Sequence, residues 1–190
     1  MISVYAGSFE EVKPNEEPPL SWPSEKDYGI NTVRKNVVFM KNFMFEELAN
    51  NHAGRISFIH IYPGLVDGPG FYNADNPLWF KIVWRLVYPF LWATYMTAPD
   101  TCGMVMAFLA TGAFPAKGET VLPDGEPEAA VGTEGTRGSG VYSVGQRADP
   151  GNKLGTTTYP TFQGKDIRKK IWDATMGVFE RVERENASKQ

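Results

Sequence analysis

Cysteine and histidine, which serve as metal ligands, nucleophiles or general bases in many sites, are scarce in this chain. The sequence contains one cysteine, Cys102, and two histidines, His52 and His60. A single cysteine excludes an internal disulfide framework and a zinc site built from cysteines. His60 lies inside an apolar run, where a histidine is more often a hydrogen-bonded core residue than a general base or a metal ligand. The sequence therefore predicts no metal site.

The composition and the charge balance narrow the class of protein. Of the 190 residues, 42% are hydrophobic and 22% are charged, which suits one folded domain with a sizeable core. The net charge of −3 argues against a nucleic-acid partner, because such proteins usually carry a basic face. The first residues show neither the basic part nor the apolar part of a signal peptide, and we expect a cytoplasmic location.

Short apolar runs alternate with longer periodic segments along the chain. The pattern predicts strands over residues 2–6, 56–61 and 141–145 and helices over residues 29–49, 99–113 and 166–186. Segments rich in proline, glycine or acidic residues predict loops over residues 8–28, 65–77 and 115–140. In the first helix, the spacing of the apolar residues predicts an inner face of Val33, Val37, Met40, Met44 and Leu48.

This order of elements predicts an α/β fold. A strand, a loop, a helix and a second strand form a βαβ unit, whose crossover is expected to be right-handed. Three strands make a thin parallel sheet, and the strand at residues 2–6 would leave one edge unpaired. We therefore interpret residues 1–190 as a single domain. It would form the later part of a larger, doubly wound parallel sheet, or it would pair with another chain.

Three segments add a resemblance to a known family. They are residues 46–49 (Glu-Glu-Leu-Ala), 56–64 (Ile-Ser-Phe-Ile-His-Ile-Tyr-Pro-Gly) and 137–142 (Arg-Gly-Ser-Gly-Val-Tyr), and the helix around Trp172 agrees with them. In this order they resemble the C-terminal half of a fungal-type short-chain dehydrogenase/reductase. The resemblance implies an incomplete Rossmann-like fold without the N-terminal Gly-rich nucleotide-binding half. Residues 132–135 (Gly-Thr-Glu-Gly) follow no predicted strand and open no helix, so they do not replace it.

The resemblance also implies a set of catalytic residues. In that family a tyrosine hydroxyl acts as general acid/base, a lysine four residues later binds the nicotinamide ribose, and a serine polarises the substrate oxygen. This Tyr-x-x-x-Lys pair is missing here. The nearest candidates are Tyr28, which precedes Lys35 by seven residues, and Ser8. The alternatives are a tyrosine that packs at the helix entrance, a solvated lysine and a turn serine.

The turn after the strand at residues 56–61 gives the clearest cofactor signal. Pro63, Gly64 and Val66 match the family's loop that runs along the nicotinamide, so the resemblance implies NAD or NADP as the cofactor. The alternative is a Pro-Gly pair that only ends the strand. The residues that distinguish NAD from NADP would belong to the half of the fold without a counterpart here.

Residues 78–98 are the most apolar segment of the chain. They contain three tryptophans and no acidic residue, and they are interrupted by Lys81, Arg85 and Pro89. The segment is long enough to span a bilayer, but its two cations make a span the least favoured of three interpretations. The other two are an apolar lid over a hydrophobic substrate and a helix at a membrane interface.

The resemblance implies an NAD(P)-dependent oxidoreductase that acts on a hydrophobic carbonyl or alcohol. The missing tyrosine–lysine pair keeps a second hypothesis open, in which the chain is a non-catalytic or truncated relative that serves as a membrane-associated or partner-binding module. The expected partners are a hydrophobic small-molecule substrate and a second copy of the chain or another chain. A peripheral contact with a membrane surface is the remaining option.

The strand at residues 2–6 generates a first testable prediction. Its free edge would present unpaired N–H and C=O groups, so we expect the isolated chain to form oligomers or aggregates. Size-exclusion chromatography with light scattering measures this directly. A monodisperse monomer with a sharp thermal transition would contradict the prediction.

Overall fold

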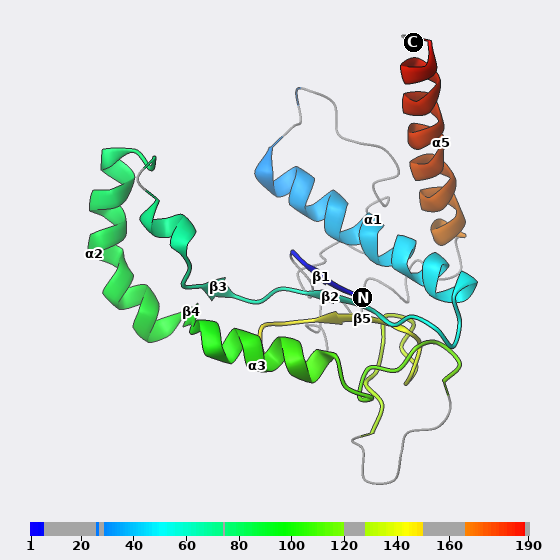
Figure 1. Cartoon of the computed structure of the whole chain (residues 1–190), viewed down its shortest axis with the longest axis horizontal. Coiled ribbons are helices and arrows are strands. Elements are labelled where there is room, and N and C mark those ends of the chain that lie inside the picture. The colour runs from blue at the N-terminus through cyan, green and yellow to red at the C-terminus, as the bar shows by residue number, and fades with distance from the viewer. Residues whose placement is uncertain (6–25, 27–28, 74, 120–127, 150–165, 189–190) are drawn as a thin grey trace.

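The chain folds around a small parallel sheet that carries helices on both faces, and a separate arm extends from it (Figure 1). The computed structural model describes residues 1–5, 26, 29–73, 75–119, 128–149 and 166–188. Within the first helix, the side chains of residues 30–36 lie outside this description.

Three strands form the main sheet in the spatial order β1-β2-β5. They are β1 (Ile2–Val4), β2 (Phe58–Ile61) and β5 (Val141–Val144). Both pairs are parallel, and Ile59 in β2 lies opposite Ile2 on one side and Tyr142 on the other. The structure thus confirms the α/β class and the three predicted strands. Among the described residues β1 pairs only with β2, as expected for an open edge.

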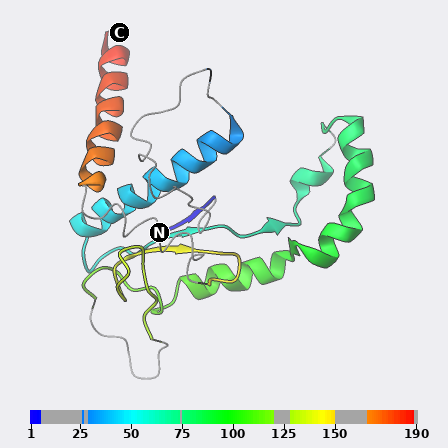
Figure 2. The ribbon, with the colours of Figure 1, turned by 180° about the vertical axis from the view of Figure 1, so that it is seen from behind.

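Helices cover opposite faces of this sheet (Figures 1 and 2). The helices of the body are α1 (Ile30–Asn51), α3 (Pro99–Leu109) and α5 (Ile167–Ala187). Phe45 of α1 packs with Phe58, whereas Leu109 of α3 packs with Ile59. Neighbouring residues of a strand point to opposite faces, so β2 supplies both cores. All four residues of β2 are buried, which explains why its sequence does not alternate with polar residues.

α1 is also buried on the side that does not face the sheet, because α5 packs there. Phe39 and Phe43 of α1 form a cluster with Ile167 and Ile171 of α5. The rings of Phe39 and Phe43 lie 4.9 Å apart between their centroids. α1 therefore forms a middle layer between the sheet and α5.

The predicted inner face of α1 is confirmed in part. Met40 is buried in the cluster with α5, while Val37, Met44 and Leu48 are partly buried. The side chain of Val33 lies outside the described residues. The residues of α1 that are at most 1% exposed are Val38, Phe39, Asn42, Phe43, Glu46 and Ala49. A helix between two layers buries a wider surface than a single apolar stripe, and here that surface includes polar side chains.

Between β2 and α3 the chain leaves the body and forms the arm (Figure 1). Its elements are β3 (Leu65–Val66), the 3-10 helix η2 (Pro69–Tyr72), α2 (Leu78–Thr94) and β4 (Met96–Thr97). β3 and β4 pair in parallel as a second, two-stranded sheet. The predicted loop over residues 65–77 is therefore wrong in part. The pairing of Leu65 with Met96 is a long-range contact that no local pattern encodes.

The contact between α1 and α5 supports a prediction about stability. Ile171 is fully buried, and Ile171→Ala leaves a cavity in that cluster. We expect the free energy of unfolding in urea to fall by about 2–5 kcal/mol. Val182→Ala, at a 45% exposed position of the same helix, is the matched control and should change it by less than about 0.5 kcal/mol. Equal effects of the two substitutions would show that α5 does not pack on α1 in solution.

Candidate functional site

The C-terminal edge of the main sheet gathers the ends of three parallel strands. Tyr5, Tyr62 and Gly145 directly follow β1, β2 and β5. The Tyr5 amide donates to the Ile61 carbonyl at 2.9 Å, and the Tyr62 amide donates to the Val144 carbonyl at 3.1 Å. Backbone pairing therefore continues to the edge at which open α/β sheets bind their ligands.

The turn after β2 is packed so closely that only glycine fits at position 64. Gly64 has a φ of +80°, in the left-handed region. A Cβ atom there would lie 2.5 Å from both Gln146 Oε1 and Thr97 Oγ1. Gln146 follows β5 and Thr97 belongs to β4, so the turn joins the sheet to the arm. Pro63 and Gly64 lie in this turn and Val66 follows in β3, where the arm begins; their contact with a cofactor stays a prediction.

A lysine that the sequence pattern does not single out lies at the same edge. The Lys41 Nζ atom is 5.9 Å from the ring centroids of both Tyr5 and Phe45, within the range of a cation–π interaction. Burial lowers the pKa of the Lys41 ammonium from its ordinary value. A partly buried cation beside Tyr5 makes Lys41 a candidate ligand-binding residue.

His60 is a hydrogen-bonded core residue, as its place in an apolar run predicts. It is fully buried, and its Nδ1 atom lies 3.0 Å from Asn42 Oδ1, within hydrogen-bonding distance. Burial, and secondly the charge of Lys41, lower the pKa of His60 to about 3. The imidazole is therefore neutral near pH 7, and it holds its face of α1 to β2.

The predicted catalytic residues fall on parts of the chain that the structure does not describe in full. Ser8 and Tyr28 lie outside the described residues. Lys35 lies in α1 at a position whose side chain is outside them as well. Their catalytic roles stay predictions. Lys41, six residues after Lys35, could have been noticed as an ionisable residue inside the most apolar part of the helix.

An ionic network lies at the opposite, N-terminal edge of the sheet. The Thr133 hydroxyl donates to Glu46 Oε1 at 2.6 Å, and Arg168 Nε lies 3.7 Å from Glu46 Oε2. Arg168 also pairs with Glu134 at 2.7 Å, and Glu134 pairs with Lys117 at 2.8 Å. The network joins α1, α5 and the segment before β5. Residues 132–135, already rejected as a phosphate loop, are thereby part of the packing.

Burial controls the ionisation of Glu46. Its side chain is 1% exposed, and burial raises its pKa to about 7. The Thr133 hydrogen bond and the charge of Arg168 act against this rise, and the charge of Glu134 adds to it. Because ligands bind at the other edge of such sheets, we assign Glu46 to the stability of the fold rather than to a reaction.

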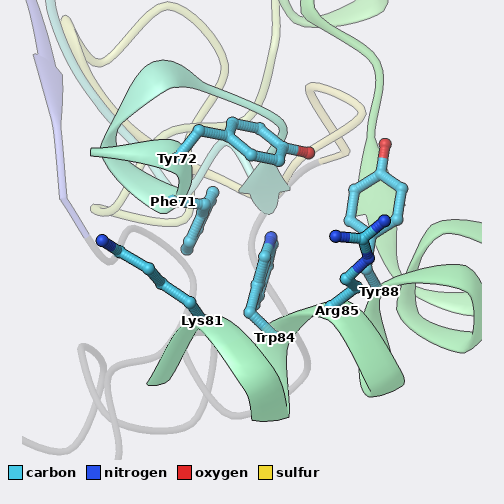
Figure 3. A pocket seen from close by; sticks show the side chains of 6 residues that line it. All are labelled: Phe71, Tyr72, Lys81, Trp84, Arg85 and Tyr88. Atoms are coloured by element: carbon cyan, nitrogen blue, oxygen red, sulfur yellow. The ribbon is translucent and has the colours of Figure 1, made fainter. Parts of the chain in front are cut away.

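The arm holds an aromatic groove of about 350 Å³ between η2 and α2 (Figure 3). Its lining residues are Phe71, Tyr72, Lys81, Trp84, Arg85 and Tyr88. The rings of Phe71 and Trp84 stack with 4.2 Å between their centroids. Figure 3 shows the Lys81 and Arg85 side chains rising from α2 on the two sides of Trp84. Aromatic walls with two cations suit an apolar or amphipathic ligand.

The comparisons with known proteins agree with the resemblance seen in the sequence. The chain is 46% identical over 191 residues to short-chain dehydrogenase/reductase SAT2 of Stachybotrys chartarum, and the match covers 99% of this chain and 52% of that protein. It is 27% identical over 187 residues to oxidoreductase AN1596 of Emericella nidulans, covering 96% of this chain and 54% of that protein. It is 25% identical over 191 residues to oxidoreductase andH of Emericella variicolor, covering 96% and 52%.

The chain spans about half the length of the curated relatives that it matches. No family model matches the chain, and no solved structure matches it. The similarities therefore support the short-chain dehydrogenase/reductase family through named relatives alone.

Glu46 yields a prediction about pH. Its folded pKa of about 7 lies above the ordinary value of 4.5, so the folded state binds more protons than the unfolded state between these values. The protonated Glu46 side chain stabilises the folded state fully below pH 4.5, and this stabilisation is lost as the pH rises to about 7. Glu46→Gln retains an acceptor for Thr133 but removes the titration. The difference in unfolding free energy, native minus variant, should fall with rising pH by up to about 1.4 kcal/mol per unit.

Urea denaturation of both proteins from about pH 4 to about pH 8 measures this difference. His60 acts in the opposite sense, because its lowered pKa makes the fold lose stability as the pH falls below 6.5. Both proteins contain His60, so its effect cancels in the difference. A difference that does not change with pH would contradict the raised pKa of Glu46.

Proposed function

We propose that the chain corresponds to the C-terminal half of a short-chain dehydrogenase/reductase. The whole protein would be an NAD(P)-dependent oxidoreductase that acts on a hydrophobic carbonyl or alcohol. The observation that carries this proposal is the 46% identity to a protein of that name over 99% of the chain. The parallel order β1-β2-β5 supports it, since the later strands of a Rossmann-like sheet would pair in this way.

The described residues fit the nicotinamide end of a dinucleotide rather than its pyrophosphate. The Gly64 turn follows β2 at the C-terminal edge of the sheet, Val66 lies in β3 directly after that turn, and Lys41 lies beside Tyr5 at the same edge. Among the described residues, no glycine-rich turn leads from a strand into an α-helix, which is how such folds hold a pyrophosphate. We therefore assign only the nicotinamide contact to this part of the chain.

The chain's own residues would bind and orient the reactants. A bound nicotinamide supplies the hydride that passes to or from the carbonyl carbon. The turn at Pro63 and Gly64 would form one wall of the ring site. Lys41, a second lysine candidate beside Lys35, would place a positive charge near ribose hydroxyls or a developing alkoxide. The aromatic groove of the arm would take the apolar body of the substrate.

One sequence feature favours a second candidate function. The chain lacks the Tyr-x-x-x-Lys pair, and without a positioned acid/base a relative binds a dinucleotide but transfers a hydride slowly. Such a protein would be a non-catalytic, partner-binding member of the family. Cofactor binding without measurable turnover would support this function, and turnover would exclude it.

A glycine substitution tests the cofactor role of the turn. Gly64→Ala places a Cβ atom 2.5 Å from the Gln146 and Thr97 side-chain oxygens, so the turn or these two side chains must move. We expect NADH or NADPH to bind the native chain and to bind this variant about tenfold more weakly, a change of about 1.4 kcal/mol. Calorimetric titration of both dinucleotides measures it.

Gly118→Ala is the matched control. Gly118 has the same φ of +80°, but a Cβ atom there would meet nothing within 4 Å. Both variants therefore carry the same backbone strain, and only Gly64→Ala adds a clash with neighbouring side chains. Absence of binding to the folded native chain, or equal binding by the native chain and Gly64→Ala, would contradict a cofactor contact at this turn.

A further inference from the structure

The outward side of α2 is apolar along its length. No residue of α2 is buried. The large apolar side chains of this side, each between 48% and 75% exposed, are Leu78, Trp79, Ile82, Val83, Leu86 and Phe90. These residues are called the outward row below. Soluble proteins rarely expose a continuous apolar row of this kind unless it binds something.

The opposite side of α2 packs against the rest of the arm. The rings of Phe80 and Trp84 lie nearly parallel, 8° apart, and Trp84 stacks on Phe71 of η2. The Tyr88 hydroxyl donates to the Asp67 carboxylate at 3.2 Å. A surface helix normally turns its apolar side inward and its polar side outward. α2 packs an aromatic side against η2, and its outward side is apolar as well. It therefore differs from an ordinary surface helix, whose outward side is polar.

The charges along α2 indicate what the outward row contacts. Lys81 and Arg85 are the only charged residues between Asp75 and Asp100, although the whole chain carries a net charge of −3. Four residues apart, they share one side of the helix, between the outward row and the aromatic groove that they also line. Trp92, 45% exposed, lies on the same flank. An apolar row bordered by cations and tryptophan matches the interface of an anionic membrane.

We propose that α2 docks the arm on the surface of a bilayer that contains anionic phospholipids, with the helix axis in the plane of the membrane. The outward row enters the boundary between headgroups and acyl chains, and Lys81 and Arg85 contact lipid phosphates. The helix lies on the bilayer rather than across it. In the described part of the chain no helix has the length and apolarity that a span requires. The docking does not depend on hydride transfer, and it requires that the outward row stays exposed in the whole protein.

A second copy of the chain is the less suitable occupant. The outward row runs from Leu78 to Phe90 of α2, so it is about 18 Å long and about 10 Å wide. A stable protein interface buries about 800 Å² on each partner and surrounds its apolar centre with a polar rim. The row is too narrow for that area, and it has a charged border on one flank only.

Flotation with vesicles of equal parts phosphatidylcholine and phosphatidylserine tests the proposal. The native chain should float with these vesicles, while aggregated protein stays at the bottom of the gradient. A double substitution, Leu86→Glu with Phe90→Glu, should lower the vesicle-bound fraction at least about tenfold, because it removes the apolar contact. Lys81→Ala and Arg85→Ala should each weaken binding about fivefold, and only when phosphatidylserine is present.

Val182→Glu is the matched control, since it places the same charge at a 45% exposed apolar position of α5, away from the arm. It should float like the native chain. Circular dichroism and a thermal melt verify that all variants are folded. Absence of flotation of the native chain, or unchanged flotation of the double variant, would overturn the proposal. So would a dimer that does not float and that the double variant turns into a monomer, which would show an interface between copies.

Discussion

The central strand β2 is the constraint on which the rest of the fold depends. All four of its residues are buried, and both of its edges are paired, one with β1 and one with β5. Its two faces must therefore be covered by different helices, and α1 and α3 supply this cover. After Ile61 the chain reaches the edge of the sheet and turns at Gly64, where Gln146 and Thr97 leave no room for a side chain. One buried strand thus determines both helical layers, the C-terminal edge of the sheet and the point at which the arm begins.

Two buried polar contacts fix how α1 lies across that strand. Asn42 contacts His60, and one turn further along the helix Glu46 contacts Thr133. Each contact adds only about 1 kcal/mol, but a buried polar group without its partner costs about 1–3 kcal/mol. A shift of α1 along β2 would break both contacts at once. The two contacts therefore select a single position of the helix on the strand. This position places Lys41 over the C-terminal edge and Glu46 at the N-terminal edge, which separates a candidate ligand-binding charge from a structural one.

Local sequence patterns predicted the parts of the fold whose signals are local. The apolar run of β2 and the Pro-Gly pair after it were sufficient to predict a strand and a turn. The cofactor contact of that turn came from the family resemblance and stays a prediction. β3 and β4 escaped prediction, because each has two residues and exists only through pairing with the other. Lys41 and Glu46 escaped for a related reason. Whether an ionisable side chain on a helix is buried depends on α5 and on the segment around Thr133, which are far away in the sequence.

The arm is stabilised by different contacts from those of the body. The pairing of β3 with β4 holds the two ends of the arm together, and the arm is tied to the body by the Gly64 turn against Gln146 and by a hydrogen bond of 2.7 Å between the hydroxyls of Tyr62 and Tyr95. Isolated helices of this length are marginal in water, and most helical stability comes from packing. Only the aromatic side of α2 packs, against η2 and β4. A surface that covers the outward row would therefore add stability where the body supplies least, and the same helix would still close the aromatic groove with its other side.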